Sequence, residues 1–319
     1  MTDYQEKQYV RYLSVVIPVY NEEENIDELF SRLKKTLDEK KYNWEVVFIN
    51  DGSSDQTKDI LVRLHNQNSE VKIIEFNRNY GQHSAVFAGF NEVEGEVVVV
   101  LDADLQNPPE EIPILINKLE EGYDVVSGLR ENRQDSWFRK IPSFFMAKII
   151  SFATGVKMKD YGTMLRAYKR EIIENVKNCQ EISSYIPALA NLFAKKVTEI
   201  NVKHSSRSGG KSKYSFLKLL KLNFDFMTGF SALPIHFVSI MGLFVSFLGL
   251  GFGAFLGLRR LFLGDLPGEG GVFTLFAVLF VFMGIQIFSL GLIGEYIGRI
   301  YSEVRRRPRY FIKHKFIHR

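Results

Sequence analysis

Two aspartates one residue apart, Asp102 and Asp104, directly follow a run rich in valine, and Gln106 comes two residues later. Carboxylates at the end of an apolar strand lie at the mouth of a low-dielectric region, which is unfavourable unless a cation is there. Carboxylate and amide oxygens are hard ligands that suit Mg²⁺ or Mn²⁺. The pattern therefore predicts a divalent-cation site, with a pair of solvated loop carboxylates as the alternative.

Three other polar clusters also follow apolar runs, at residues 20–22, 50–55 and 77–80. In open parallel sheets, ligands bind at the carboxyl ends of the strands. We therefore expect these clusters to converge with Asp102 on one site. The NDGSSD segment at 50–55 has a second interpretation, because Asp-Gly forms turns and Ser54 or Asp55 can cap the helix that follows.

The elements that must position these clusters alternate between two patterns. Continuous apolar runs predict strands at residues 12–20, 44–50, 71–76, 96–104 and 124–130. The segments between them, 22–39, 55–66, 81–94 and 109–121, carry apolar residues at helical spacing. We predict a doubly wound α/β domain with a mainly parallel, Rossmann-like sheet. A glycine-rich dinucleotide fingerprint and a Walker loop are both absent from the sequence, which argues against NAD binding and ATP hydrolysis.

Two long apolar runs, 233–258 and 271–294, lie in the last third of the chain. Each exceeds the roughly 20 residues that cross about 30 Å of hydrocarbon. The charged side chains between residues 231 and 294 are confined to Arg259, Arg260, Asp265 and Glu269. We predict a transmembrane hairpin of two helices, with a pair of buried core helices as the alternative.

The distribution of charge predicts the orientation of this hairpin. The last 25 residues hold eight Lys or Arg against Glu295 and Glu303, so the positive-inside rule places both termini in the cytoplasm of a multi-pass inner-membrane protein. Residues 203–221 contain six Lys or Arg and no acid, which indicates interfacial amphipathic helices, with ordinary surface helices as the alternative. The net charge of +4 comes from the tail, so no nucleic-acid partner is indicated. The single cysteine excludes an internal disulfide.

Four ordered motifs give the chain a resemblance to a known family: VVIPVYNEEENI at 15–26, VVFINDGSSDQT at 46–57, FNRNYGQHSAVFAGF at 76–90 and VVVLDADLQNPPEEI at 98–112. With the C-terminal hairpin, they resemble the family 2 glycosyltransferases of GT-A fold. The resemblance is specifically to the polyisoprenyl-phosphate glycosyltransferases, which include bactoprenol glucosyltransferases, the aminoarabinose-type transferase and dolichol-phosphate mannose synthases. It covers nearly the whole chain.

The resemblance implies roles for residues at the matching positions. A nucleotide-sugar site is implied at Pro18, Tyr20, Glu22, Asp51 and Asp102, and a metal site at Asp104 and Gln106. An acceptor-phosphate site is implied at Arg130, Arg139, Arg207 and Lys211, the last two in a basic loop. Asp160 resembles an aspartate that acts as a base or orients the acceptor, with capping as the alternative. Catalytic roles are thus expected for Asp102, Asp104 and Asp160.

The implied reaction is inverting transfer of one sugar from a nucleotide sugar to a polyprenyl phosphate such as undecaprenyl phosphate, with Mg²⁺ or Mn²⁺. The expected donor is UDP-glucose; a modified arabinose or mannose is the alternative sugar, and a non-catalytic membrane-anchored nucleotide-sugar-binding module is the alternative function. A processive polysaccharide synthase is disfavoured, because neither Trp44 nor Trp137 lies in a Gln-x-x-Arg-Trp motif.

These expectations give a division of the chain into four parts. We expect a GT-A catalytic domain at 1–210, juxtamembrane interfacial helices at 211–232, the hairpin at 233–298 and a basic cytoplasmic tail at 299–319. Gly249, Gly253 and Gly257 repeat at four-residue spacing, which would let another helix pack closely. Together with the resemblance, this repeat favours a homo-oligomer such as a tetramer.

Overall fold

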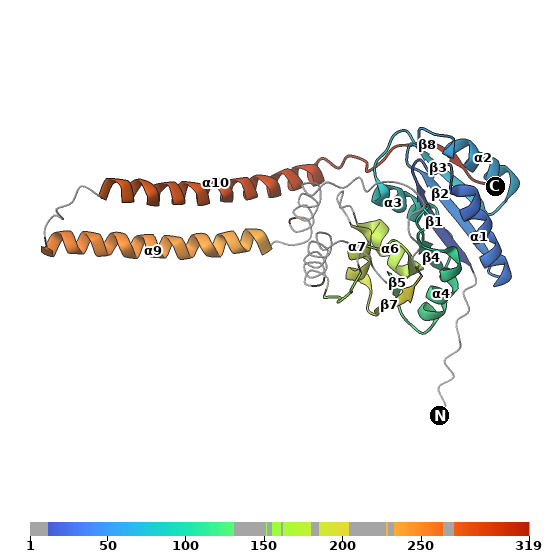
Figure 1. Ribbon diagram of the computed structural model, residues 1–319, viewed down its shortest axis with the longest axis horizontal. Helices are drawn as coiled ribbons and strands as arrows, with labels where there is room; N and C mark the ends of the chain where they lie inside the picture. Colours follow the sequence, from blue (N-terminus) through green and yellow to red (C-terminus); the bar gives the residue numbers. More distant parts are fainter. Residues whose placement is uncertain are drawn as a thin grey trace, which may run out of the picture. The chain divides into compact units, whose positions relative to one another are not determined.

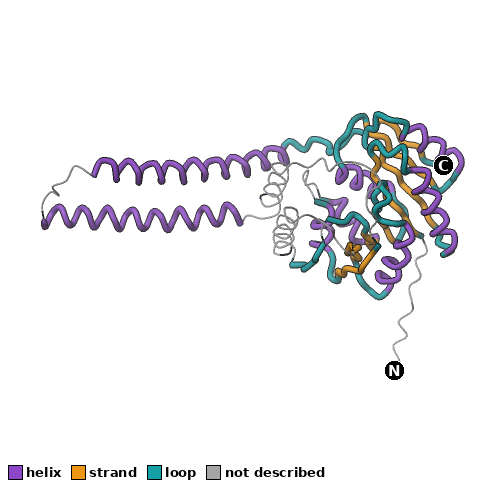
Figure 2. Tube along the Cα trace, viewed as in Figure 1, coloured by secondary structure: helices purple, strands orange, loops and turns teal. Residues whose placement is uncertain are grey.

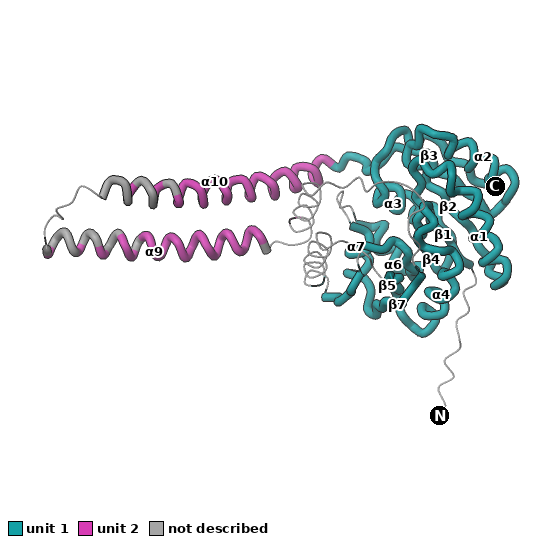
Figure 3. The backbone as a smooth tube through the Cα atoms, viewed as in Figure 1, with its two compact units in different colours: residues 1–219, 306–319 teal, residues 220–305 magenta. Residues whose placement is uncertain are grey.

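The computed structural model describes residues 12–130, 151, 155–160, 162–179, 185–203, 228, 233–263 and 271–318. The chain divides into two compact units, one of residues 1–219 with 306–319 and the other of residues 220–305 (Figure 3). The first unit contains the sheet and its helices, and the second contains two long helices.

The first unit is built on an eight-stranded sheet with the order β7-β5-β6-β4-β1-β2-β3-β8 (Figure 1). Its strands are β1 (Leu13–Val19), β2 (Trp44–Asn50), β3 (Val71–Phe76), β4 (Val97–Val100), β5 (Val125–Arg130), β6 (Arg166–Lys169), β7 (Val197–Val202) and β8 (Ile312–Phe316). Its helices are α1 (Ile26–Glu39), α2 (Thr57–Gln67), α3 (Gln82–Glu92), α4 (Ile112–Glu120) after the short 3-10 turn η1 (Pro109–Glu111), α6 (Arg170–Asn178) and α7 (Ile186–Phe193).

The centre of the sheet is parallel, as the sequence predicts. β4, β1, β2 and β3 are neighbours and run in one direction, and every residue of β1, β2 and β4 is buried. The sides of the sheet are mixed, because β6 runs antiparallel between β4 and β5, and β8 runs antiparallel along β3. The α/β prediction is confirmed, and the antiparallel strands β6 and β8 and the parallel strand β7 are additions that the sequence patterns did not reveal.

Helices cover both faces of this sheet (Figure 2). Alternate side chains of each strand point to opposite faces, so Val15 and Ile17 of β1 pack with the apolar residues of α1, α2 and α4. Val16 points the other way and packs with those of α3, α6 and α7. The central strands therefore need no polar face, which is why they appear in the sequence as unbroken apolar runs.

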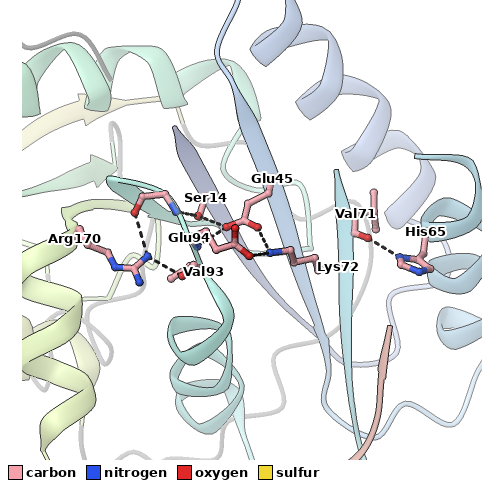
Figure 4. A network of polar contacts seen from close by, with 9 residues as sticks. Ser14, Glu45, His65, Val71, Lys72, Val93, Glu94 and Arg170 are labelled. Atoms are coloured by element: carbon pink, nitrogen blue, oxygen red, sulfur yellow. Dashed lines mark hydrogen bonds and ion pairs between the residues drawn. The ribbon is translucent and has the colours of Figure 1, made fainter. Parts of the chain in front are cut away.

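A buried polar network lies at the amino ends of the central strands (Figure 4). Glu45, which is 1% exposed, accepts hydrogen bonds from the Ser14 hydroxyl and the Glu94 backbone, both at 2.6 Å, and pairs with Lys72 at 2.6 Å. These partners join the starts of β1, β2 and β3 to the loop before β4. Removing one member of such a network would leave a buried charge uncompensated, so we assign this end of the sheet to stability.

The second unit contains α9 (Leu233–Leu263) and α10 (Gly271–Val304), which contact one another. A Cβ added at Gly249 of α9 would lie 4.0 Å from the Phe282 ring of α10. Among the described residues, Val281–Val304 is long and apolar enough to cross a membrane, whereas the apolar stretch Pro234–Gly249 is shorter. One long apolar helix is thus present near the C-terminus, and the spanning of the membrane by both helices stays a prediction.

The last residues of the chain return to the first unit. β8 pairs with β3 from Phe76↔Ile312 to Ile73↔Phe316, with a bulge between Glu75 and Phe76. The sequence analysis describes residues 299–319 only as a basic tail, and its charged side chains include Lys313 and Lys315 on this strand. An edge strand carrying lysines resists pairing with further strands, so β8 closes one side of the sheet.

Close packing of α3 on the sheet gives a stability prediction. A Cβ at Gly89 would lie 2.4 Å from Val16 Cγ1 and 2.9 Å from Ile49 Cδ1. Gly89→Ala should lower the free energy of unfolding by about 1–3 kcal/mol through overpacking, despite the higher helix propensity of alanine. Gly242→Ala in α9, where the added Cβ meets nothing within 4 Å, is the matched control. Thermal unfolding of the detergent-solubilised chain measures both, and equal stability of the two variants would contradict the packing argument.

Candidate active site

Asp102 lies just beyond β4, at the carboxyl end of the parallel strands. Its Oδ1 accepts a hydrogen bond from Gln82 Nε2 at 2.5 Å, and its Oδ2 accepts one from Asn107 Nδ2 at 3.4 Å. Gln82 begins α3, and Asn107 lies in the loop before η1. Two amide side chains from different elements thus orient a single carboxylate, although the sequence analysis assigned no role to either.

The charge of Asp102 is poorly compensated. Burial, together with the negative charge of Asp104, raises the pKa of Asp102 to about 7, and the hydrogen bond from Gln82 opposes this shift. Asp104 is half-buried, and its Oδ1 accepts the backbone N–H of Gln106 at 3.2 Å. Between them Leu105 has a φ of 58°, an uncommon value for a residue with a side chain, which marks a tight turn.

These residues fit a divalent cation that completes its coordination with a ligand. Two neighbouring carboxylates, one with a raised pKa, make an electronegative position that a cation would stabilise. Among the described residues, no group of three or more His, Cys, Asp or Glu side chains could hold a metal ion. A cation at Asp104 and Gln106 would therefore depend on oxygens supplied by a bound anion, as expected for a metal–diphosphate pair.

Asp51, at the end of β2, joins the loops that follow β2 and β3. It is 3% exposed, and its two carboxylate oxygens accept the backbone N–H groups of Tyr80 and Gly81 at 2.7 and 2.9 Å. Burial raises the pKa of Asp51, and the two amide hydrogen bonds oppose this. Gly52 has a φ of 71°, and a Cβ there would lie 2.4 Å from the carbonyl carbon of Arg78. The Asp-Gly pair is therefore required by close approach of the loops as well as by turn geometry.

The loop after β1 is joined to the loop after β2. The backbone N–H of Asn21 donates to Ser53 Oγ at 3.0 Å, and that of Glu22 donates to Thr57 Oγ1 at 3.0 Å. The Glu22 carboxylate accepts Asn25 Nδ2 at 2.6 Å. Tyr20 is 46% exposed at this edge, whereas Pro18 is buried within β1. Of these two residues, only Tyr20 has a side chain accessible at the carboxyl edge of the sheet.

Asp160 and Arg130 form a bidentate ion pair. Arg130 Nε lies 2.7 Å from Asp160 Oδ2, and Nη2 lies 2.9 Å from Oδ1. The Gly162 N–H also donates to Oδ1 at 2.9 Å, and the Asp160 side chain is 3% exposed. Parallel hydrogen bonds of this kind fix the plane of a guanidinium. The resemblance implies separate roles for these two residues, and the structure brings them together.

A buried cationic residue that the sequence analysis missed lies one strand away. Arg166 of β6 is fully buried, opposite Val100 in the register of the sheet, and its Nε donates to the Thr163 carbonyl at 3.1 Å. Burial and the nearby Arg166 charge lower the pKa of His83 to about 4, so this histidine is neutral at pH 7. Arginine in a short polar strand carries no signal that would have identified it in advance.

Three of the residues implied for the acceptor site, Arg139, Arg207 and Lys211, lie outside the described residues. Arg130 is the member of that set that the structure describes. Its position at the end of β5 agrees with a site at the carboxyl edge of the sheet.

The fold and the arrangement of these strand ends agree with comparisons to known proteins. Residues 14–177 match the family described as Glycosyl transferase family 2, and the chain belongs to that family. The chain is 51% identical over 305 residues to an undecaprenyl-phosphate 4-deoxy-4-formamido-L-arabinose transferase of Serratia proteamaculans (strain 568), covering 95% of this chain and 94% of the relative. The transferase of the same name from Proteus mirabilis (strain HI4320) is 50% identical over the same shares of the two chains.

These relatives confirm the predicted resemblance within the family, to the polyisoprenyl-phosphate glycosyltransferases, and the chain is an enzyme of the glycosyltransferase class. A solved structure of glucosyl-3-phosphoglycerate synthase from Mycobacterium tuberculosis, in complex with Mn²⁺ and uridine-diphosphate-glucose, is similar with a TM-score of 0.50 and 16% identity. The similarity covers 68% of this chain and 77% of that one, and it confirms the GT-A fold alone.

The raised pKa of Asp102 gives a prediction for stability against pH. Because the folded-state pKa of about 7 lies above the ordinary 3.8, ionisation of Asp102 opposes folding. This destabilisation is absent below the ordinary pKa of 3.8, grows as the pH rises from 3.8 to about 7, and is complete above about pH 7. Asp102→Asn should therefore stabilise the metal-free protein by as much as about 4 kcal/mol at about pH 8, and by less at about pH 5.5.

Thermal unfolding in the presence of a chelator measures this difference. Mn²⁺ added together with a diphosphate ligand should raise the melting temperature of the wild type and have a smaller effect on the variant, because the variant lacks the charge that the cation compensates. A variant no more stable than the wild type at the higher pH would contradict the electrostatic account of Asp102.

Proposed function

We propose that the protein transfers a 4-deoxy-4-formamido-L-arabinose unit from a uridine nucleotide sugar to undecaprenyl phosphate, with inversion at the anomeric carbon. The observation that carries the proposal is identity of 51% over 95% of the chain to a relative named for that sugar and that lipid. It is supported by the convergence of Asp51, Asp102 and Arg130 at the carboxyl edge of one sheet.

The sugar differs from the first expectation of the sequence analysis. Glucose from UDP-glucose is not supported, because the related transferases described above are named for a formamido-arabinose. The alternative of a modified arabinose fits them. Discrimination between sugars depends on a few hydrogen bonds to substituents, so shared early motifs identify the fold and leave the sugar open.

The residues of this chain support attack by a phosphate oxygen without a strong base. A phosphate monoester is largely dianionic at pH 7 and is already a nucleophile. What the protein must supply is a way to bring two anions together. Arg130 offers a guanidinium for the acceptor phosphate, and the bidentate contact with Asp160 holds that guanidinium in one plane. We assign Asp160 the role of orienting Arg130.

Asp104 and Gln106, with Asp102 beside them, are the residues that would hold Mg²⁺ or Mn²⁺. When bound, the cation would act as a Lewis acid on the leaving diphosphate. Gln82 and Asn107 would keep Asp102 in place through their hydrogen bonds. Tyr20, Glu22 and Asp51, together with Pro18, would form the nucleoside side of the donor site, and Arg139, Arg207 and Lys211 would complete the acceptor side.

The proposed substrate lipid agrees with membrane association of the second unit. We propose that α9 and α10 both span the bilayer as a hairpin with interfacial helices at 211–232, and that both termini are cytoplasmic. The apolar stretch Val281–Val304 and the contact between the two helices support this arrangement. The division at residue 210 and a homo-oligomer such as a tetramer are part of the same proposal.

A donor screen tests the function. The purified chain in detergent is supplied with undecaprenyl phosphate, Mn²⁺ and a panel of nucleotide sugars, and the lipid-linked product is detected by mass spectrometry. We expect transfer from the formamido-arabinose nucleotide and little from UDP-glucose. Preferential transfer of glucose would reject the sugar, and no transfer from any donor would reject the reaction.

The cation site is tested in the same assay. Asp104→Ala should lower turnover by at least about 100-fold, because the leaving diphosphate loses its electrostatic stabilisation. Asp59→Ala, an exposed aspartate on α2, is the matched control and should leave turnover unchanged. Equal activity of the two variants would reject the assignment of Asp104.

The Asp160–Arg130 pair gives a prediction that separates orientation from base catalysis. Asp160→Asn and Arg130→Lys should each lower kcat/KM for the lipid by about 100-fold, because misplacement by about 1 Å has an effect of this size. The double variant should be little worse than either single variant, since the two residues act as a unit. If Asp160 were instead the catalytic base, Asp160→Asn should remove the fall in kcat/KM at acidic pH. The KM for the lipid would then be unchanged.

A further inference from the structure

The last residues of the chain form a strap along the first unit, defined here as residues 309–318. The Phe311 carbonyl accepts the Asn77 N–H at 3.2 Å, and β8 then pairs antiparallel with β3. Because the direction is antiparallel, residues 309–312 lie at the carboxyl end of β3 and His318 lies toward its amino end. The strap therefore begins at the edge of the sheet that carries the candidate site.

Tyr310 connects the strap to the last residue of β3. Its ring stacks on Phe76, with centroids 4.8 Å apart and an interplanar angle of 15°. The Phe76 ring also contacts the Tyr80 ring edge-on, with centroids 5.7 Å apart and an interplanar angle of 89°. Tyr310 is also fixed at its hydroxyl, which accepts Asn91 Nδ2 at 3.1 Å. Aromatic pairs in these geometries stabilise a contact beyond the effect of the area they bury.

Tyr80 continues the connection to the site. Its backbone N–H is one of the two donors to the Asp51 carboxylate, and its side-chain hydroxyl donates to Asn77 Oδ1 at 2.9 Å. The same loop lies against Gly52 so closely that no Cβ fits there. Loop 77–81 thus contacts Phe76 through Tyr80 and engages Asp51 through two backbone amides, and Phe76 in turn stacks on Tyr310.

Arg309 fixes the start of the strap by contacts to different elements. Its guanidinium lies 3.8 Å above the Phe87 ring of α3 and donates to the Cys179 carbonyl at 2.9 Å. Cation–π contacts and hydrogen bonds of a charged group are among the stronger polar interactions. The position of Tyr310 is therefore determined by α3 and the end of α6 as well as by β3.

We propose that the C-terminal strap is a structural part of the donor-nucleotide site, in which Tyr310 is a positioning residue that holds loop 77–81 in the conformation that engages Asp51. The inference rests on the proposed function, which places the nucleotide at this edge. Residues that follow α10 in the sequence would thus contribute to the affinity for the donor, in addition to the motifs in the first part of the chain.

The far end of the strap supplies a matched control. His318 stacks on His65 at 3.9 Å and bonds to the His65 carbonyl at 3.0 Å, so it anchors the same strap by contacts of a similar kind. These contacts are with α2 and do not include loop 77–81. His318→Ala should loosen the far end of the strap, whereas Tyr310→Ala should act on loop 77–81, and Tyr310→Phe should retain the stacking on Phe76.

The first experiment is hydrogen exchange on the full chain in detergent, which does not depend on the identity of the donor. Tyr310→Ala should accelerate exchange of the Tyr80 and Gly81 amides by about tenfold or more, with the β1 and β2 amides unchanged. Tyr310→Phe should stay close to the wild type. Unchanged exchange at residues 77–81, or equal acceleration there in His318→Ala, would overturn the proposal.

The second experiment measures transfer kinetics with the active donor. Tyr310→Ala should raise KM for the nucleotide sugar by about 5–10-fold and leave kcat within about twofold of the wild type. Tyr310→Phe should have a KM close to that of the wild type. A fall in kcat alone, or the same change in His318→Ala, would overturn the role in donor affinity. Absence of transfer by the wild type would reject the proposed function instead, and the exchange experiment would still decide whether the strap positions the loop.

Discussion

The carboxylates of Asp51 and Asp102 lie at the ends of strands whose own residues are buried, so the sheet places Asp51 out of contact with water and leaves Asp102 partly buried. Burial raises the pKa of both. The Asp51 carboxylate accepts hydrogen bonds from two backbone amides, and these bonds connect the loop after β2 to the loop after β3. Asp102 accepts hydrogen bonds from two side-chain amides and lies near the Asp104 carboxylate, and the balance of these influences raises its pKa.

The arrangement of the other parts follows from that edge. The loops after β1, β2 and β3 are linked to one another by backbone-to-side-chain hydrogen bonds, so each loop restrains the position of the next. The opposite, amino end of the same strands carries the buried Glu45–Lys72 network. Stability and chemistry are thus separated to the two ends of one sheet, as is general for folds of this class.

The sequence predicts the central strands and their polar ends well, because strands buried on both faces leave unbroken apolar runs. The run at 44–50 coincides with Trp44–Asn50, and that at 71–76 coincides with Val71–Phe76. β6 and β8 were missed for a physical reason: RAYK and IKHKF are short, polar and paired with strands far away in the chain. The Arg130–Asp160 contact was missed for a similar reason, since thirty residues separate the partners and a bidentate pair leaves no pattern in sequence.

The position of β8 also bears on how the chain is made. β3 leaves the ribosome early, but its antiparallel partner follows both helices of the second unit, and about 110 residues separate the end of β7 from the start of β8. At about 5–20 residues per second, translation of that interval takes about 5–20 s, during which the outer edge of β3 stays open. An open edge is a template for pairing with other chains. A nascent or prematurely terminated polypeptide therefore lacks both the strand that closes the sheet and Tyr310, which stacks on Phe76 next to loop 77–81, and this edge of the sheet is completed only after residue 316 is made.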